Sequence, residues 1–360
     1  MTIVGESHGE LVGVVVDGAP PGVPFGPEDV QPALDRRRPG QSLLSTQRQE
    51  ADRVSIRSGT LDGRTTGAPV LMTIPNEDAR SQDYAQMRDT PRPGHSDYPA
   101  RVRFSGMNDP RGSGMFSGRL TAAWTMAGAL AQKVLAAHGV QVAAHAVRVG
   151  SVATAAAPDV AAIRARVDAT PVRCADLDAA PRMIEEVERA RKAGDSVGGV
   201  VACVAEGLPA GLGDPLMDPV EGLLAHALYT VPAVKGVEFG DGFALAGMRG
   251  SEARDPYVLQ DGAVRTSANH NGGALGGMTT GMPLRLQVAF KPTSSIPLAQ
   301  DTVDLRRGEP ATLRVTGRHD PCIVPRAVPV VESVVACVLL DLLLERHGSL
   351  GVAKPFLEGA

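Results

Sequence analysis

Four of the eight histidines lie in polar turns flanked by glycine or proline, where a titratable ring can be aimed into a cleft. With the neighbours that could orient their rings, these are His8 with Ser7, His95 with Asp97, His270 with Asn269, and His319 with Asp320. Imidazole moves protons efficiently near neutral pH. We therefore interpret these turns as candidates for acid–base catalysis, and interpret the four histidines within helix or strand patterns as surface or core residues.

Two other kinds of site are disfavoured by spacing. No H-x-x-x-H or H-E-x-x-H pattern occurs, so zinc ligands would have to come from distant segments, and we expect no metal site. A Ser-His-Asp hydrolase is disfavoured because the chain has no G-x-S-x-G turn. The four cysteines show no C-x-x-C spacing and indicate reduced, buried thiols.

Arginines cluster near the N-terminus. Six guanidinium groups lie between positions 36 and 57, at Arg36, Arg37, Arg38, Arg48, Arg53 and Arg57. Guanidinium is a rigid bidentate donor suited to phosphate and carboxylate. This cluster therefore indicates an anionic ligand.

Several polar, glycine-rich loops point to the same ligand class. They cover residues 34–42, 92–98, 108–120, 269–281 and 291–295. Glycines let the backbone approach a ligand, and successive free N–H groups favour anions. The loop at 108–120 leads into a helix whose N-terminus would favour phosphate, although its spacing differs from the dinucleotide fingerprint.

The chain alternates between strand and helix patterns without a clear linker. Strands are predicted at 11–17, 53–58, 69–74, 142–149, 197–205, 234–239, 284–290 and 312–316, and helices at 28–37, 118–138, 158–168, 181–193, 218–228 and 328–346. The last helix is apolar almost all round, so we expect it in the middle of the structure. We predict a single α+β domain over 1–360, with a variable, insertion-like segment at 150–180.

Composition limits the remaining function classes. The chain is 43% hydrophobic and 21% charged, as a globular protein with a sizeable core requires. Its net charge of −4 and 3% aromatic content argue against nucleic-acid binding. The apolar run near the C-terminus is interrupted by Asp341, and no signal peptide is evident, so we expect a cytoplasmic protein without a membrane span.

Eight sequence blocks, in order, resemble the signature blocks of chorismate synthases. They are GESHG at 5–9, RRRPGQS at 36–42 with TQRQE at 46–50, RPGHSDY at 92–98, GDSVGG at 194–199, VKGVEFGDGF at 234–243, NHNGG at 269–273, KPTSS at 291–295, and GRHDPC at 317–322 with RAVP at 326–329. The resemblance covers nearly the whole chain. It implies trans-1,4 elimination of phosphate and a C6 proton from 5-enolpyruvylshikimate 3-phosphate, giving chorismate, with reduced FMN required although no net redox change occurs.

The resemblance also implies roles for individual residues. His8 would protonate the departing phosphate, His95 would stand near the flavin, and Asp320 would take a proton from flavin N5. The implied cofactor-binding residues are Ser117, Gly276, Lys291, Pro292, Thr293, Ser294, Ser295 and Arg318. The implied substrate-binding residues are Ser7, Arg36, Arg37, Arg38, Arg48 and Arg119.

The family fold implied by the resemblance has a helical core between two antiparallel sheets, in a β-α-β layered arrangement assembled as a homotetramer. Whether NADPH reduces the flavin on this chain or a separate flavin reductase does so stays open. The main alternative is another FMN-dependent enzyme, such as an NADPH-dependent reductase. A binding module that only cradles an anion, and an RNA-binding protein, are less consistent with the residues.

Overall fold

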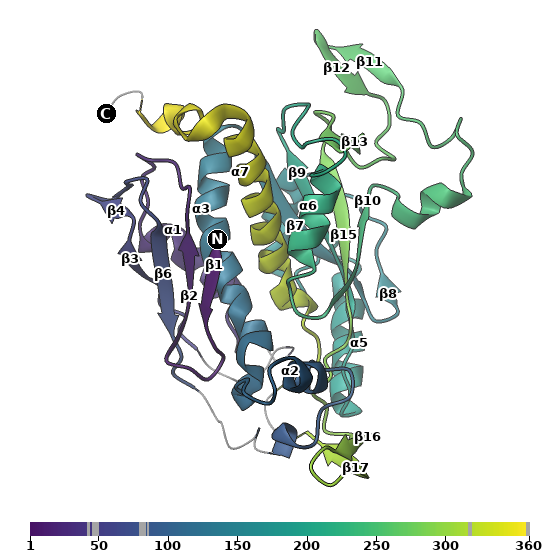
Figure 1. Ribbon diagram of the computed structural model, residues 1–360. Helices are drawn as coiled ribbons and strands as arrows, with labels where there is room; N and C mark the ends of the chain where they lie inside the picture. The colour runs from purple at the N-terminus through teal and green to yellow at the C-terminus, as the bar shows by residue number, and fades with distance from the viewer. Residues whose placement is uncertain (42–43, 45–49, 79–83, 85, 316–318, 358–360) are drawn as a thin grey trace.

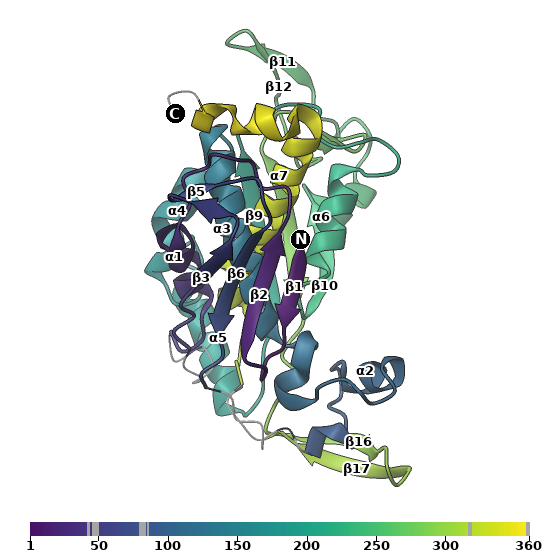
Figure 2. The ribbon, with the colours of Figure 1, turned by 60° about the vertical axis from the view of Figure 1, so that its left-hand side comes forward.

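Two antiparallel sheets face each other across a layer of helices (Figures 1 and 2). The computed structural model describes residues 1–41, 44, 50–78, 84, 86–315 and 319–357. The first sheet has the order β1 (Thr2–Gly5), β2 (Leu11–Val16), β6 (Val70–Pro75) and β3 (Ser55–Ser58). The second has the order β10 (Val234–Phe239), β15 (Leu284–Phe290), β9 (Gly199–Glu206), β7 (Gln141–Val149) and β8 (Val152–Ala153).

Apolar side chains alternate along the strands, and this explains why each sheet has one apolar face that packs inward. In the first sheet, β2 and β6 pair with Val12 opposite Ile74 and Val14 opposite Met72, and all four side chains are fully buried. In the second, β15 alternates buried and half-buried residues along its whole length. A period of two places these residues on one face, so each sheet buries that face against the helices.

The central layer is built from α1 (Pro27–Arg37), α3 (Thr121–Ala137) and α7 (Val324–Leu357). Helices α3 and α7 approach so closely that a Cβ on Gly128 would lie 2.2 Å from Cβ of Ser333, so glycine is required at this contact. Helix α7 is long and apolar enough to cross a membrane by length and composition, but 78% of its most apolar stretch is buried within this protein. Its apolar composition is therefore explained by its central position, as the sequence predicts.

Other elements surround this sandwich. The remaining helices are α2 (Asp97–Arg103), α4 (Val160–Arg166), α5 (Ala180–Lys192) and α6 (Val220–Leu228). Short 3₁₀ segments occur at η2 (Gln86–Arg88), η3 (Arg111–Phe116), η4 (Gly118–Leu120), η5 (Val167–Ala169) and η6 (Gly242–Gly247). Small hairpins are formed by β4–β5 (Thr60–Leu61, Arg64–Thr65), β11–β12 (Tyr257–Gln260, Ala263–Thr266), β13–β14 (Ala274–Leu275, Met278–Thr279) and β16–β17 (Ala299–Asp304, Glu309–Arg314). In Figure 1, β11–β12 and β16–β17 project at opposite ends of the molecule.

The predicted α+β class, with helices between two antiparallel sheets, is confirmed. Each strand and helix expected from periodicity is present, with shifted ends in most cases. The pattern does not predict β1, α2 or β16, nor the short strands β4, β5, β8 and β11 to β14. Helix α2 was missed because it begins at Asp97, inside a glycine- and proline-rich stretch that resembles a loop. The segment 150–180 contains β8, α4 and η5, and its character as an insertion stays a prediction.

Candidate active site

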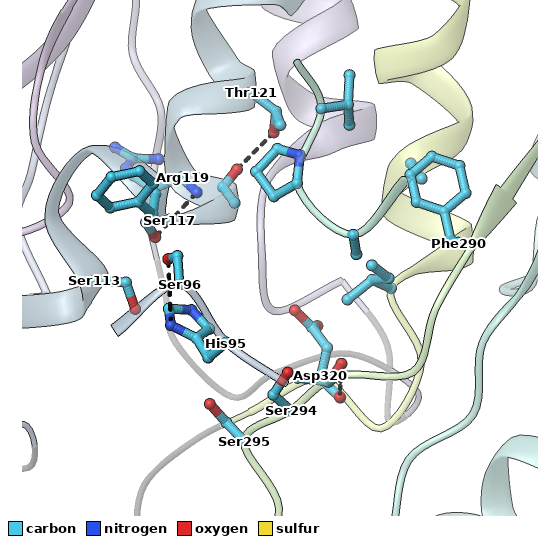
Figure 3. Close-up of a pocket in the computed structure, with 18 of the residues that line it drawn as sticks. His95, Ser96, Ser113, Ser117, Arg119, Thr121, Phe290, Ser294, Ser295 and Asp320 are labelled. Carbon is cyan, nitrogen blue, oxygen red and sulfur yellow. Dashed lines mark hydrogen bonds between the residues drawn. The ribbon is translucent and has the colours of Figure 1, made fainter. Parts of the chain in front are cut away.

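A cavity of about 630 Å³ lies at the end of the helical layer where α3 and α7 begin. Its walls come from residues far apart in sequence, including 94–96, 112–119, 229–235, 290–295 and the first turns of both helices (Figure 3). This volume is in the range of small-molecule and cofactor sites. The positive ends of two long helices face the cavity, and this arrangement favours anionic ligands.

His8 and His95 belong to this one site. His95 lines the cavity directly. The His8 ring lies at its edge, packed edge-on against Tyr84 at a centroid distance of 5.2 Å, and Tyr84 also lies 5.9 Å below the guanidinium of Arg92. A Cβ on Gly112 would lie 2.4 Å from the His8 ring, and the positive φ of 57° at Gly112 also favours glycine. The two histidines are therefore connected through Tyr84 and Arg92.

The ring of His95 is held by a buried ion pair. Its Nδ1 lies 2.6 Å from Asp97 Oδ1, and Asp97 is in turn bound by Arg92 through Nη2 at 2.7 Å. Burial lowers the pKa of His95; the hydrogen bond to Asp97 opposes this, while Arg92 and Lys291 lower it further. Burial would raise the pKa of Asp97, but the hydrogen bonds from Arg92 and His95 reverse this and hold it well below its usual range. Near pH 7 the site therefore holds an anionic Asp97 beside a neutral His95.

Two buried arginines share one carboxylate at another wall of the cavity. Arg37 and Arg119 both line the cavity, and both form ion pairs with Asp52, which is 1% exposed. Burial lowers the pKa of Arg37, and the charge of Asp52 opposes that shift. Burial would raise the pKa of Asp52, but the two guanidinium charges outweigh it and lower the value. Arg119 also lies 4.0 Å from Oε2 of the buried Glu50, so two guanidinium groups and two carboxylates form one buried charge cluster at the cavity wall.

The position of Arg37 follows from the limits of α1. Pro27 occupies the first turn, and the carboxylate of Asp29 accepts a hydrogen bond from Gly26 N at 2.9 Å, so the helix start is well defined. Arg36 and Arg37 lie in the last turn, where basic side chains complement the helix dipole. The end of α1 therefore presents a buried guanidinium to the cavity.

The segment after β15 forms a polar wall. The residues of this segment that line the cavity are Lys291, Pro292, Thr293, Ser294 and Ser295. Figure 3 labels the two serines. Thr293 donates to the Asp320 carbonyl at 3.1 Å, and Ser294 donates to the Gly94 carbonyl at 2.8 Å. Burial lowers the pKa of Lys291, and the nearby charge of Lys235 lowers it further. These contacts bring the KPTSS block beside Asp320 and the loop of His95.

Opposite the charged groups, the cavity has an apolar wall. It is built from the segment before β10, the end of β15 and the first turns of α7, with Val231, Pro232, Phe290, Ile323, Ala327 and Val330. A flat aromatic ring could lie on this wall while its polar edges face the lysine, hydroxyl and guanidinium groups. The donors and shape therefore fit a flavin beside an anionic substrate.

The structure brings most of the predicted site residues together. In addition to those named above, Ser7, Ser117 and Asp320 line the cavity. Three predictions are not supported by the placement of the side chains. Arg36 forms ion pairs with Glu332 and Asp168. Arg38 is exposed near Asp35, and Gly276 lies in the β13–β14 turn. None of these three predicted residues is among the cavity-lining residues. Arg48 and Arg318 lie outside the described residues.

Several site residues were not predicted from the sequence. Arg92 lies three residues before His95 in the same block, and Arg326 lies six residues after Asp320 in the RAVP block. Arg326 donates to Asp320 Oδ2 at 2.6 Å, and Ser113 adopts a positive φ of 71° while lining the cavity. Both arginines could have been found from the sequence, because each lies a few residues from a titratable residue of a motif. Asp52 and Tyr84 carried no comparable signal.

Comparisons with known proteins show the family of this chain. The profile of the chorismate synthase family matches residues 1–344. The chain is 50% identical over 353 residues to the chorismate synthase of Thermococcus kodakarensis, covering 98% of each chain, and 51% identical over 340 residues to that of Korarchaeum cryptofilum, covering 94% of each. A crystal structure of a chorismate synthase superposes with a TM-score of 0.78 at 26% identity, covering 99% of this chain and 96% of the other. The chain therefore belongs to the chorismate synthase family, a family of carbon–oxygen lyases.

Proposed function

We propose that this protein converts 5-enolpyruvylshikimate 3-phosphate to chorismate by trans-1,4 elimination and requires reduced FMN. The single observation that supports this most strongly is the shared cavity. It combines His95, buried arginines, a lysine–hydroxyl wall and an apolar wall in one space, and His8 packs against Tyr84 of its lining. Each part corresponds to a demand of the reaction: proton transfer, an anionic substrate, and a flat cofactor.

The cofactor would be held by the polar and apolar walls together. Lys291 and the hydroxyls of Thr293, Ser294 and Ser295 would bind polar edges or the phosphate of FMN, and the apolar wall near Phe290 would contact its ring. When bound, reduced FMN supplies an electron-rich ring to the reacting substrate. Ser117 would add a hydroxyl from the loop before α3. Arg318 remains a proposed cofactor contact from the family resemblance.

The substrate carries a phosphate and two carboxylates, so it requires several cations. Arg37 and Arg119 would supply bidentate donors, and Ser7 a hydroxyl, at the wall near His8. Arg48 is proposed from the family resemblance to join them. Because Asp52 fixes both buried guanidinium groups, they would meet the substrate with little loss of side-chain entropy.

In the elimination, the bond between C3 and the phosphate oxygen breaks with its electron pair, and a proton leaves C6. His8 would donate a proton to the departing phosphate, which makes phosphate a better leaving group. Asp320, held by Arg326, would act as a proton acceptor on the cofactor side of the cavity. His95 would provide a second imidazole near the flavin.

The experiment that tests the proposal measures phosphate release from 5-enolpyruvylshikimate 3-phosphate under anaerobic conditions. We expect release with reduced FMN and none without flavin, together with tighter FMN binding when substrate is present. Release without flavin, or no release with reduced FMN, would contradict the proposal. Net oxidation of NADPH that depends on substrate would instead favour the alternative, an NADPH-dependent reductase.

We also propose the biological setting implied by the family. The protein would act in the cytoplasm as a homotetramer on a small-molecule substrate, with neither nucleic acid nor membrane as a partner. Its flavin would be reduced either by NADPH on this chain or by a separate flavin reductase. Sedimentation of the purified protein and FMN reduction by NADPH in its presence would test the two points separately.

A further inference from the structure

Arg92 is a buried guanidinium that joins three loops of the site. It is 4% exposed and donates through Nε to Asp97 Oδ2 at 2.7 Å, through Nη1 to Ser295 Oγ at 2.9 Å, and through Nη2 to Ser113 Oγ at 2.8 Å. Nη2 also donates to Asp97 Oδ1 at 2.7 Å and lies 3.0 Å from His95 Nδ1. One side chain therefore sets the spacing of the segments that carry His95, Ser113 and the KPTSS block.

The hydrogens of Arg92 determine the direction of its contact with His95. A guanidinium Nη carries two hydrogens. At Nη2 both are taken by oxygen acceptors, Asp97 Oδ1 and Ser113 Oγ. None is left for the ring nitrogen, so the 3.0 Å approach of Nη2 to His95 Nδ1 is not a hydrogen bond that the ring accepts.

The lone-pair sites of the Asp97 carboxylate also indicate that His95 Nδ1 carries a proton. An ionised carboxylate offers about four lone-pair sites. Three are taken by residue 92, through its backbone N–H at 3.0 Å, Nε and Nη2. The remaining site faces His95 Nδ1 at 2.6 Å, a distance typical of a charge-assisted hydrogen bond. His95 must therefore be the donor in this contact.

We propose that Arg92 and Asp97 are positioning residues that hold His95 with its proton on Nδ1, so that Nε2 is the nitrogen that exchanges a proton with a bound ligand. This inference rests on the proposed function only for the identity of that ligand. Nε2 makes no hydrogen bond to any residue within the described part of the chain, and His95 lines the cavity. His95 thus meets the ligand as a neutral acceptor. On gaining a proton at Nε2, it becomes a cation whose Nδ1–H still donates to Asp97.

The ring nitrogens can be observed directly by ¹⁵N NMR of the full-length protein labelled at histidine, with His95 assigned through the His95→Gln variant. At pH 7 and without ligand, we expect Nδ1 protonated and Nε2 unprotonated. A proton on Nε2 and none on Nδ1 would overturn the proposal. This readout requires no turnover, so the proposal can fail while phosphate release is normal, and the proposed function can fail while the tautomer is as expected.

The variant Asp97→Asn changes the hydrogen-bond pattern with little change in shape. The single amide oxygen should take the place of Oδ2, where two N–H groups of residue 92 converge, which leaves the NH₂ group facing His95 Nδ1. We expect the proton to move to Nε2 and kcat to fall about 10²-fold or more, with KM changed by less than about threefold. Unchanged ring signals in this variant would overturn the proposal.

Two further variants separate positioning from general stability. Arg92→Lys keeps the charge but loses the fork that binds both oxygens of Asp97, so we expect a mixture of tautomers and a smaller loss of kcat than in Asp97→Asn. Asp89→Asn is the matched control, because Asp89 pairs with Arg101 at 3.0 Å on the surface of the same region. It should leave both the ring signals and kcat unchanged. An equal loss of kcat in the control would show that the effect is not specific to His95.

Discussion

Arg326 donates from Nη1 to Asp320 Oδ2 at 2.6 Å, and the same guanidinium donates through Nε to the Arg37 carbonyl at 3.2 Å. One side chain on the first turn of α7 therefore fixes the proposed proton acceptor relative to the end of α1. We expect Arg326→Gln to lower the rate of phosphate release about 10- to 100-fold, and Arg326→Lys to lower it less, because the ammonium keeps the charge. The control is Arg307→Gln, at an exposed guanidinium. Equal rates for wild type and Arg326→Gln would contradict the assignment.

The histidine variants test the two proposed imidazole roles. We expect His8→Ala and His95→Ala each to lower kcat about 10²-fold or more, the usual loss when general acid–base help is removed. Binding of substrate and FMN, measured by fluorescence or calorimetry, should fall less than kcat. Full activity in both variants would refute the roles. His347→Ala, at an exposed position on α7, is the control and should behave as wild type.

The contact between Gly112 and His8 predicts a strong effect for one methyl group. In Gly112→Ala the new Cβ would lie 2.4 Å from the His8 ring and 2.8 Å from Ser7 Oγ, so both side chains must move. We expect kcat to fall by about 10-fold or more. Gly106→Ala is matched for backbone strain, because its φ is +74°, but its Cβ would meet no atom within 4 Å. If both variants lose the same activity, strain in the backbone explains the loss and the contact does not.

Arg36 on α1 and Arg119 on η4 should respond differently to mutation. Arg36 binds Glu332, whose side chain is 5% exposed, with an Nη1–Oε2 distance of 2.5 Å. Arg36→Gln leaves that carboxylate buried without its partner, so we expect the free energy of unfolding to fall by about 3–5 kcal/mol. The KM for substrate of the folded variant should change by less than about threefold.

Arg119→Gln is the matched comparison for Arg36→Gln. Arg119 lines the cavity, so its loss should raise the KM for substrate about 10-fold or more. Urea unfolding and initial rates of phosphate release measure the two effects. A large rise in KM for Arg36→Gln would show that Arg36 contacts substrate after all.

The buried carboxylate of Asp52 predicts a pH dependence of stability. Its pKa is lowered in the folded state, so folding releases protons relative to an unfolded pKa of about 3.9. The stabilisation is therefore fully present above about pH 4 and is lost as pH falls through the lower, folded pKa. Asp52→Asn should lower the free energy of unfolding at pH 7 and flatten its decline in acid. Urea titrations between pH 7 and pH 3 measure both changes.

The control for Asp52→Asn is Asp62→Asn. Asp62 is exposed and has nearly the same positive φ, 49° against 48° at Asp52. The control should keep both the stability and its acid dependence. Equal curves for the two variants would show that the shared carboxylate contributes no net stability.

Much of the fold follows from local patterns. Alternation along β2, β6 and β15 and the apolar composition of α7 depend on which residues stand at each position, so they can be read directly from the sequence. Helix α2 could not be predicted in this way. Its seven residues follow a turn rich in glycine and proline, and Ser96 before it makes no side-chain capping hydrogen bond, so no local signal marks the start of this helix.

The sequence predicted which types of residue form the candidate site, but only partly which individual residues line it. His95, Asp320 and the KPTSS block were identified through their motifs and line one cavity, while His8, also identified through its motif, packs against Tyr84 of that lining. The partners that hold these residues, Arg92 and Arg326, were not identified. An ion pair depends on distance in space, which sequence separation does not report.

By itself, the sequence pattern predicted an α+β domain with cations and imidazoles around an anionic ligand, and the resemblance of its blocks predicted the family and its layered arrangement. Only the tertiary structure decided which of the predicted arginines line the cavity. Arg36 and Arg37 are adjacent, but successive residues of an α-helix point about 100° apart. One guanidinium therefore pairs with Glu332 in the helical layer, while the other reaches Asp52 and the cavity.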